Sequence, residues 1–85
     1  MSAKVVKRID PRRVILQMVD GSLIQGKVNA YRFDNAIERV SDIFTRVTDP
    51  FVVVFDATMG DKTGLILSIN KRNISWVSHE FDQRQ

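Results

Sequence analysis

Basic side chains near the N-terminus are one of two groups in this 85-residue chain that could bind an anion. They are Lys4, Lys7, Arg8, Arg12 and Arg13. Residues 1–13 also hold one acid, Asp10, so their net charge is +4, whereas the rest of the chain sums to −1. Such a segment can contact phosphate, but basic terminal segments also serve only for solubility. Both interpretations stay open, with Arg12 and Arg13 as the candidate phosphate contacts.

The second group is the polar turn Asn70-Lys71-Arg72-Asn73, which separates two apolar runs, 65–69 and 74–77. Asparagine tolerates the left-handed backbone of tight turns, so the composition predicts a short connection between two strands. Trp76 follows closely and offers a flat face on which a nucleic-acid base can stack. A lone tryptophan in a small domain is more often a core or interface residue, and we favour that interpretation.

Catalytic chemistry finds little support in the sequence. His79 is the only histidine and there is no cysteine, which excludes a metal cluster built on histidine or thiolate. Asp56 interrupts an apolar strand and is the carboxylate that most needs a partner, but one acid does not make a general acid–base pair. No glycine-rich phosphate loop is present. We therefore expect a protein that is not an enzyme and holds no cofactor or metal.

Length and composition indicate one small domain. A chain this short has room for a single core, and oligomerisation is a common source of extra stability at this size. The absence of cysteine fits a reducing compartment, and we expect a cytoplasmic protein. No apolar run approaches the roughly 20 residues that a membrane span requires, so we expect no membrane association.

The elements that position these residues are mostly strands. The β-branched run 14–19 precedes Asp20-Gly21, which is a strong hairpin turn signal. Residues 23–31 then alternate between apolar and polar positions, as in a strand with one buried face. Gly26 lies inside this run and predicts a sharp bend or a bulge.

The segment 35–47 has apolar residues at three- and four-residue intervals, which predicts a short helical insertion. Asn35 with Glu38 offers a capping box, whereas a competing interpretation starts the helix at Ser41. Asp49-Pro50 ends the segment, since proline disfavours helix in the preceding residue.

A continuous apolar run, 51–55, predicts a central strand that is buried on both faces or that pairs with another subunit. A polar hairpin loop, 58–64, and the final strands 65–69 and 74–77 complete the chain. The sequence thus predicts a mainly β fold, with antiparallel strands forming a small, strongly bent barrel rather than an open sandwich. The predicted organisation is a basic arm (1–13), a barrel domain (14–80) and a polar tail (81–85).

Two stretches of the chain resemble the signatures of Sm-like and bacterial Hfq-like proteins. Residues 14–28 are similar to the first signature, with Asp20, Gly21, Ile24 and Gly26 in register. The run 70–77 resembles the Hfq sequence Tyr-Lys-His-Ala-Ile-Ser-Thr-Val and shares its Lys, Ile, Ser and Val. The resemblance implies a five-stranded, SH3-like barrel that assembles into a homo-oligomeric ring.

In that family the second signature lines the central pore and touches uridine. The resemblance therefore implies that Asn70, Lys71 and Arg72 contact single-stranded RNA. The chain departs from the Hfq pattern where Asn70 replaces tyrosine and Arg72 replaces histidine, and also by a long insertion between the two signatures, mostly 32–49.

The insertion resembles a small family of uncharacterised bacterial proteins that carry Arg-Leu-Ser-Asp, matched here by Arg39-Val40-Ser41-Asp42. Spacing of three residues on a helix favours an ion pair between Arg39 and Asp42. Two functions remain. The first is an RNA-binding ring, and the second is a non-catalytic oligomeric module that binds protein partners.

Overall fold

A computed structural model describes residues 6–33 and 36–79 of the chain. The strands are β1 (Val6–Met18), β2 (Leu23–Phe33), β3 (Phe51–Met59), β4 (Lys62–Asn70) and β5 (Ile74–His79). The helix α1 (Val40–Thr45) follows β2, and the short 3-10 helix η1 (Lys71–Asn73) joins β4 to β5. The mainly β prediction, with antiparallel strands and one short helix, is confirmed. Lys4, Asn35 and the predicted tail 81–85 lie outside the described residues.

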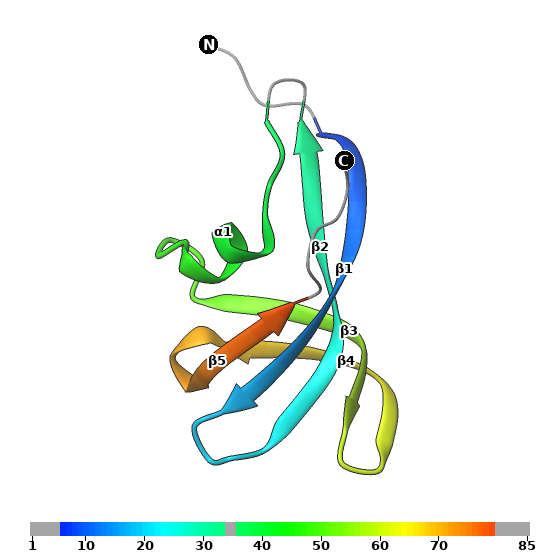
Figure 1. Ribbon diagram of the computed structural model, residues 1–85, viewed down its shortest axis with the longest axis vertical. Helices are drawn as coiled ribbons and strands as arrows, with labels where there is room; N and C mark the ends of the chain where they lie inside the picture. Colours follow the sequence, from blue (N-terminus) through cyan, green and yellow to red (C-terminus); the bar gives the residue numbers. More distant parts are fainter. Residues whose placement is uncertain (1–5, 34–35, 80–85) are drawn as a thin grey trace.

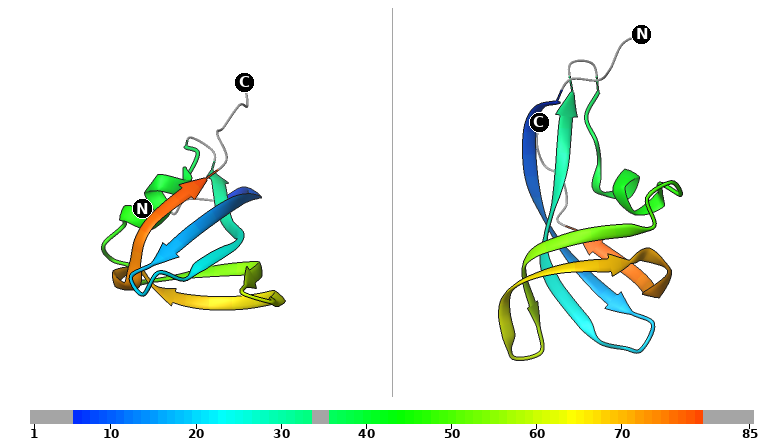
Figure 2. Two further views of the ribbon diagram at one scale, coloured as in Figure 1. Left: turned by 60° about the horizontal axis from the view of Figure 1, so that its bottom comes forward. Right: turned by 180° about the vertical axis from the view of Figure 1, so that it is seen from behind.

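The strands form one antiparallel sheet in the order β4-β3-β2-β1-β5, so β4 and β5 are its edges. Figure 2 shows that this sheet is strongly curved. In Figure 1 the upper halves of β1 and β2 stand clear of the other strands, and α1 lies beside them. Within the part of the chain that the structure describes, no pairing joins β4 to β5, and the sheet does not close into a barrel.

The first half of β1 has a sequence that is not typical of a strand, because it is rich in charged residues and contains Pro11. β1 begins at Val6, eight residues before the predicted start, and Arg8 to Arg13 pair with β2 from Arg32 to Lys27. Pro11 lies opposite Asn29, at a point where β5 does not reach, because β5 pairs with β1 only from Val14 onward. Proline is tolerated there since its missing N–H faces no partner strand.

Gly26 marks a bend, as predicted. Gln25 pairs with Thr58 but Lys27 pairs with Phe55, so β3 contributes an extra residue at this point. Asp56 lies in that bulge with φ of 51°, which an L-residue adopts only at a cost. The bulge turns the Asp56 side chain outward, where it is 62% exposed and lies 3.5 Å from the Lys27 ammonium.

The core lies between the inner face of the curved sheet and α1. It comprises Val14, Leu16, Ile24, Val28, Ala30, Val40, Ile43, Val52, Val54, Ala57 and Ile69. The predicted burial of 51–55 on both faces is wrong, because Val52 and Val54 are buried whereas Phe51 and Val53 are each 54% exposed. β3 lies between β2 and β4 in the sheet order, and its outer face carries exposed apolar side chains.

The helix α1 begins close to the later of the two predicted starts. Its N-terminus is held by the Asp42 carboxylate, which accepts a hydrogen bond of 2.9 Å from the Arg39 backbone N–H. Asp42 therefore acts on the backbone rather than in the predicted ion pair with the Arg39 side chain. The predicted turn at Asp20-Gly21 is confirmed, and hydrogen bonds from Ser22 to the Asp20 carboxylate lower the pKa of that group.

Candidate functional site

The η1 turn is held in one conformation by hydrogen bonds at both ends. The Asn70 side-chain oxygen accepts a bond of 2.9 Å from the Arg72 backbone N–H. The Lys71 backbone N–H donates to the Pro50 carbonyl at 2.8 Å, and the Asn73 carbonyl accepts from Val19 N–H at 2.8 Å. Asn70 thus stabilises the turn through its side chain. Its side-chain oxygen is already engaged in this internal hydrogen bond.

The two cations of the turn have different surroundings. The Lys71 ammonium donates to the Arg46 backbone carbonyl at 3.2 Å, so this side chain ties the turn to the segment after α1. Arg72 is exposed, and no other described residue pairs with its guanidinium. Of the predicted contacts in this turn, Arg72 is therefore the one most available to an external anion.

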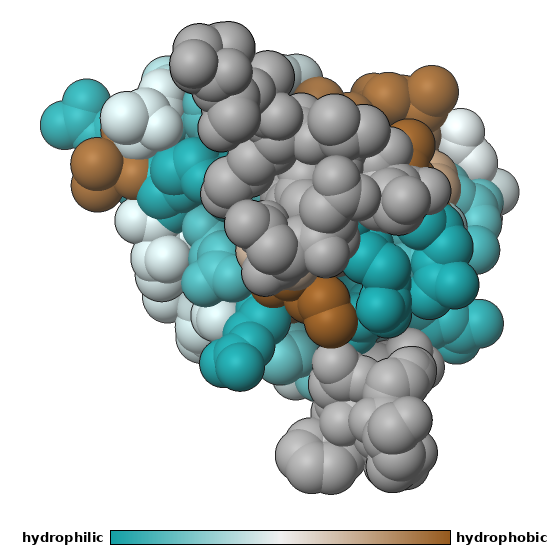
Figure 3. Space-filling view, turned by 90° about the horizontal axis from the view of Figure 1, so that it is seen from above, coloured by the Kyte–Doolittle hydropathy of each residue, from teal (hydrophilic) through white to brown (hydrophobic). Residues whose placement is uncertain are grey.

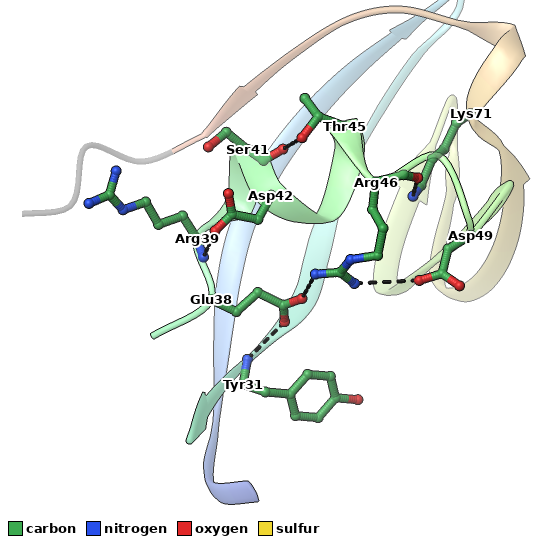
Figure 4. Close-up of polar contacts among 9 residues, drawn as sticks. All are labelled: Tyr31, Glu38, Arg39, Ser41, Asp42, Thr45, Arg46, Asp49 and Lys71. Carbon is green, nitrogen blue, oxygen red and sulfur yellow. Dashed lines mark hydrogen bonds and ion pairs between the residues drawn. The ribbon is translucent and has the colours of Figure 1, made fainter. Parts of the chain in front are cut away.

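Next to Lys71 lies a polar network that was not predicted from the sequence (Figure 4). The Glu38 carboxylate, 6% exposed, accepts the Tyr31 backbone N–H at 3.1 Å and forms an ion pair with Arg46. Arg46 also contacts the Asp49 carboxylate at 3.4 Å. Hydrogen bonding to Glu38 raises the pKa of the Arg46 guanidinium above its ordinary value. The network fastens the insertion to β2 and, through the Arg46 carbonyl, to the η1 turn.

Arg12 and Arg13 do not join the turn. Met18, near the end of β1, pairs with Ile74 directly after η1. Arg12 and Arg13 lie five or six residues earlier on β1, about 17–20 Å away at the rise of an extended strand. Successive strand residues point to opposite faces, so Arg12 lies on the core side of the sheet and Arg13 on its outer side. Arg12 also has a side-chain or backbone interaction of its own.

Arg13 borders a groove of about 520 Å³ on the outer face of the sheet, which we call the outer-face groove. It is lined by Arg13, Val14, Ile15, Gln25, Gly26, Lys27, Asp56, Thr58, Ser78 and His79. These residues come from four adjacent strands, β5, β1, β2 and β3. This groove could not be predicted from the sequence, because its residues are brought together only by the register of the strands.

Apolar side chains are also exposed in several places. Trp76, predicted as core or interface, is 45% exposed on β5. Among the residues coloured in the view from above, hydrophilic ones predominate and the hydrophobic ones lie in separate groups (Figure 3). Phe51 and Val53 on β3 form a further exposed pair, each 54% exposed.

Among residues 6–33 and 36–79, no group of three or more acidic, histidine or cysteine side chains is placed to hold a metal ion. The one α-helix in this part of the chain is too short to cross a membrane. Comparisons with protein-family models, with curated proteins and with solved structures found no match to this chain.

Proposed function

We propose that this protein is an Sm-like RNA-binding protein, which assembles into a homo-oligomeric ring and contacts single-stranded RNA through the η1 turn. The observation that carries the proposal is the exposed Arg72 guanidinium, held on a rigid turn between the two edge strands of the sheet. A cation in this position can follow a phosphate backbone without first breaking an internal ion pair.

The unpaired edges support the oligomeric part of the proposal. β4 and β5 present backbone N–H and C=O groups that no neighbouring strand satisfies within the described residues. An edge strand of this kind is a template for pairing with another chain. If β4 of one copy pairs with β5 of the next, the sheets of neighbouring subunits join into one continuous sheet that closes around the ring. The η1 turns, which join these two edges, then gather around the ring axis.

Arg72→Gln should weaken RNA binding by about tenfold or more, because each copy in the ring loses a phosphate contact. The measurement is fluorescence anisotropy of labelled U-rich and A-rich single-stranded RNAs. Arg39→Gln is the matched control, since Arg39 is also exposed and its described hydrogen bonds involve only its backbone N–H and C=O groups. Size-exclusion chromatography with light scattering should give the same oligomer for both variants.

An unchanged affinity for Arg72→Gln, or an equal loss for Arg39→Gln, would contradict a site at the turn. The former result would show that Arg72 does not contribute, and the latter that the RNA responds only to total charge. A wild-type protein that is monomeric in light scattering would contradict the proposed ring.

A non-catalytic module that binds protein partners is the second candidate. Phe51 and Val53 favour it, because both line a hollow of about 210 Å³ beside Arg46 and Lys71. Exposed aromatic side chains next to a shallow hollow are typical of protein contact sites. An oligomer that binds no RNA in the anisotropy titration would favour this second function.

A further inference from the structure

The outer-face groove has no role in the proposed RNA contact and combines two kinds of side chain. One row crosses four strands, because Ser78 pairs with Ile15, Ile15 with Gln25, and Gln25 with Thr58. Directly opposed residues of neighbouring strands lie about 4.5–5.5 Å apart and share a face. The row therefore offers two hydroxyl groups and one carboxamide, with an apolar side chain between them.

The second row is charged. Arg13 and Lys27 are directly opposed on β1 and β2. Like charges in this arrangement destabilise a strand pair. Lys27 is balanced in part by Asp56, whose carboxylate lies 3.5 Å from its ammonium. No described residue forms an ion pair with Arg13, so the row keeps a net positive charge.

An anion placed between Arg13 and Lys27 removes this repulsion and gains charge-assisted hydrogen bonds from both cations. The arginine fork suits a phosphate group in particular. Asp56 then limits the size of the ligand. Its exposed carboxylate borders the charged row and repels a second phosphate, which disfavours a polyanion lying across the groove. The groove volume of about 520 Å³ suits a small molecule.

We propose that the outer-face groove binds a small organic phosphate, a phosphate monoester that carries hydroxyl or amide groups. The phosphate lies between Arg13 and Lys27, and the body of the ligand lies over Ile15. Gln25, Thr58 and Ser78 supply its hydrogen bonds. Sugar phosphates and mononucleotides share this chemistry, and the experiment compares them directly.

The test is a titration of the labelled protein, followed by two-dimensional ¹H–¹⁵N NMR, with glucose 6-phosphate and with uridine 5′-monophosphate. Glucose, uridine and inorganic phosphate are the ligand controls. We expect saturable shifts confined to the lining residues of the groove, for at least one of the two esters. The unphosphorylated compounds should bind at least about tenfold more weakly, because they lack the charged contacts.

Two substitutions should move the affinity in opposite directions. Arg13→Gln should weaken binding about tenfold, since it removes the guanidinium that faces the phosphate. Asp56→Asn should strengthen binding, because it removes the carboxylate that competes for Lys27. Asparagine tolerates the positive φ at this position, so the bulge is kept. Lys62→Gln is the charge-matched control on the β3–β4 hairpin and should change the affinity less than about twofold.

Equal losses for Arg13→Gln and Lys62→Gln would overturn the proposal, because binding would then follow net charge alone. Weaker binding by Asp56→Asn, or equal binding of uridine and its phosphate, would overturn it as well. If a short RNA shifts the NMR signals of the same residues and binds more tightly than either ester, the ligand of the groove is an RNA strand and the small-ligand proposal is wrong. None of these outcomes depends on Arg72, so this test can fail while the proposed RNA contact stands.

Discussion

Replacing Gly26 by alanine should lower the free energy of unfolding by about 2–3 kcal/mol, which corresponds to roughly 10–20 °C in melting temperature for a domain of this size. A Cβ atom at this position would lie 2.5 Å from a methyl group of Val54 and 3.1 Å from the Phe55 carbonyl oxygen. Val54 is fully buried and the carbonyl belongs to the backbone, so neither can move away cheaply. The measurement is equilibrium unfolding in urea.

Gly64→Ala is the control for this prediction. Gly64 has φ of 68°, but nothing lies within 4 Å of the added Cβ. Alanine there should cost only the backbone strain of the left-handed region, about 1 kcal/mol. If the two variants lose the same stability, the close approach of β2 and β3 at Gly26 is not what fixes the bend.

Glu38→Ala should cost about 2–3 kcal/mol. The substitution leaves the Tyr31 backbone N–H without its acceptor and Arg46 without the buried half of its ion pair. Breaking a fully buried ion pair costs about 3–5 kcal/mol, and we expect less because Arg46 is 41% exposed and solvent screens its charge. Urea unfolding gives the total, and hydrogen exchange at the Tyr31 amide reports the local loss.

Two milder variants separate the parts of this network. Glu38→Gln keeps an acceptor for Tyr31 but removes the charge, so it should lose about half as much stability as alanine. Asp49→Asn removes a carboxylate that is 57% exposed and should cost less than about 0.5 kcal/mol. A Glu38→Ala variant as stable as Asp49→Asn would contradict the role assigned to the buried carboxylate.

The strands and their turns were largely predictable because their signals are local. Asp20-Gly21 specifies a hairpin through its backbone conformation. Gly26 indicates the bend because its lack of a side chain permits the close approach of β3. The start of β1 was not predictable in this way. Residues 8–13 include four charged side chains and Pro11, and they become a strand only because β2 provides a partner.

The site was predictable only in part, for the same physical reason. The turn 70–73 could be found because it interrupts two apolar runs. The bond between Lys71 and the Arg46 carbonyl joins residues far apart in the chain, and nothing local indicates it. Glu38 carries a recognisable signal, an acid within an apolar periodic segment, but its partner Arg46 lies eight residues away. The outer-face groove depends on the register of four strands and has no signature in the sequence.

The measurement that tests the central proposal most directly is the salt dependence of RNA binding by the wild-type protein. Labelled U-rich and A-rich single strands are titrated by fluorescence anisotropy at several salt concentrations, with the mass of the complex determined in parallel. The proposal predicts an oligomer that binds at least one of these RNAs. The logarithm of its association constant should fall linearly with the logarithm of the salt concentration. No binding to either RNA at the lowest salt concentration would contradict it.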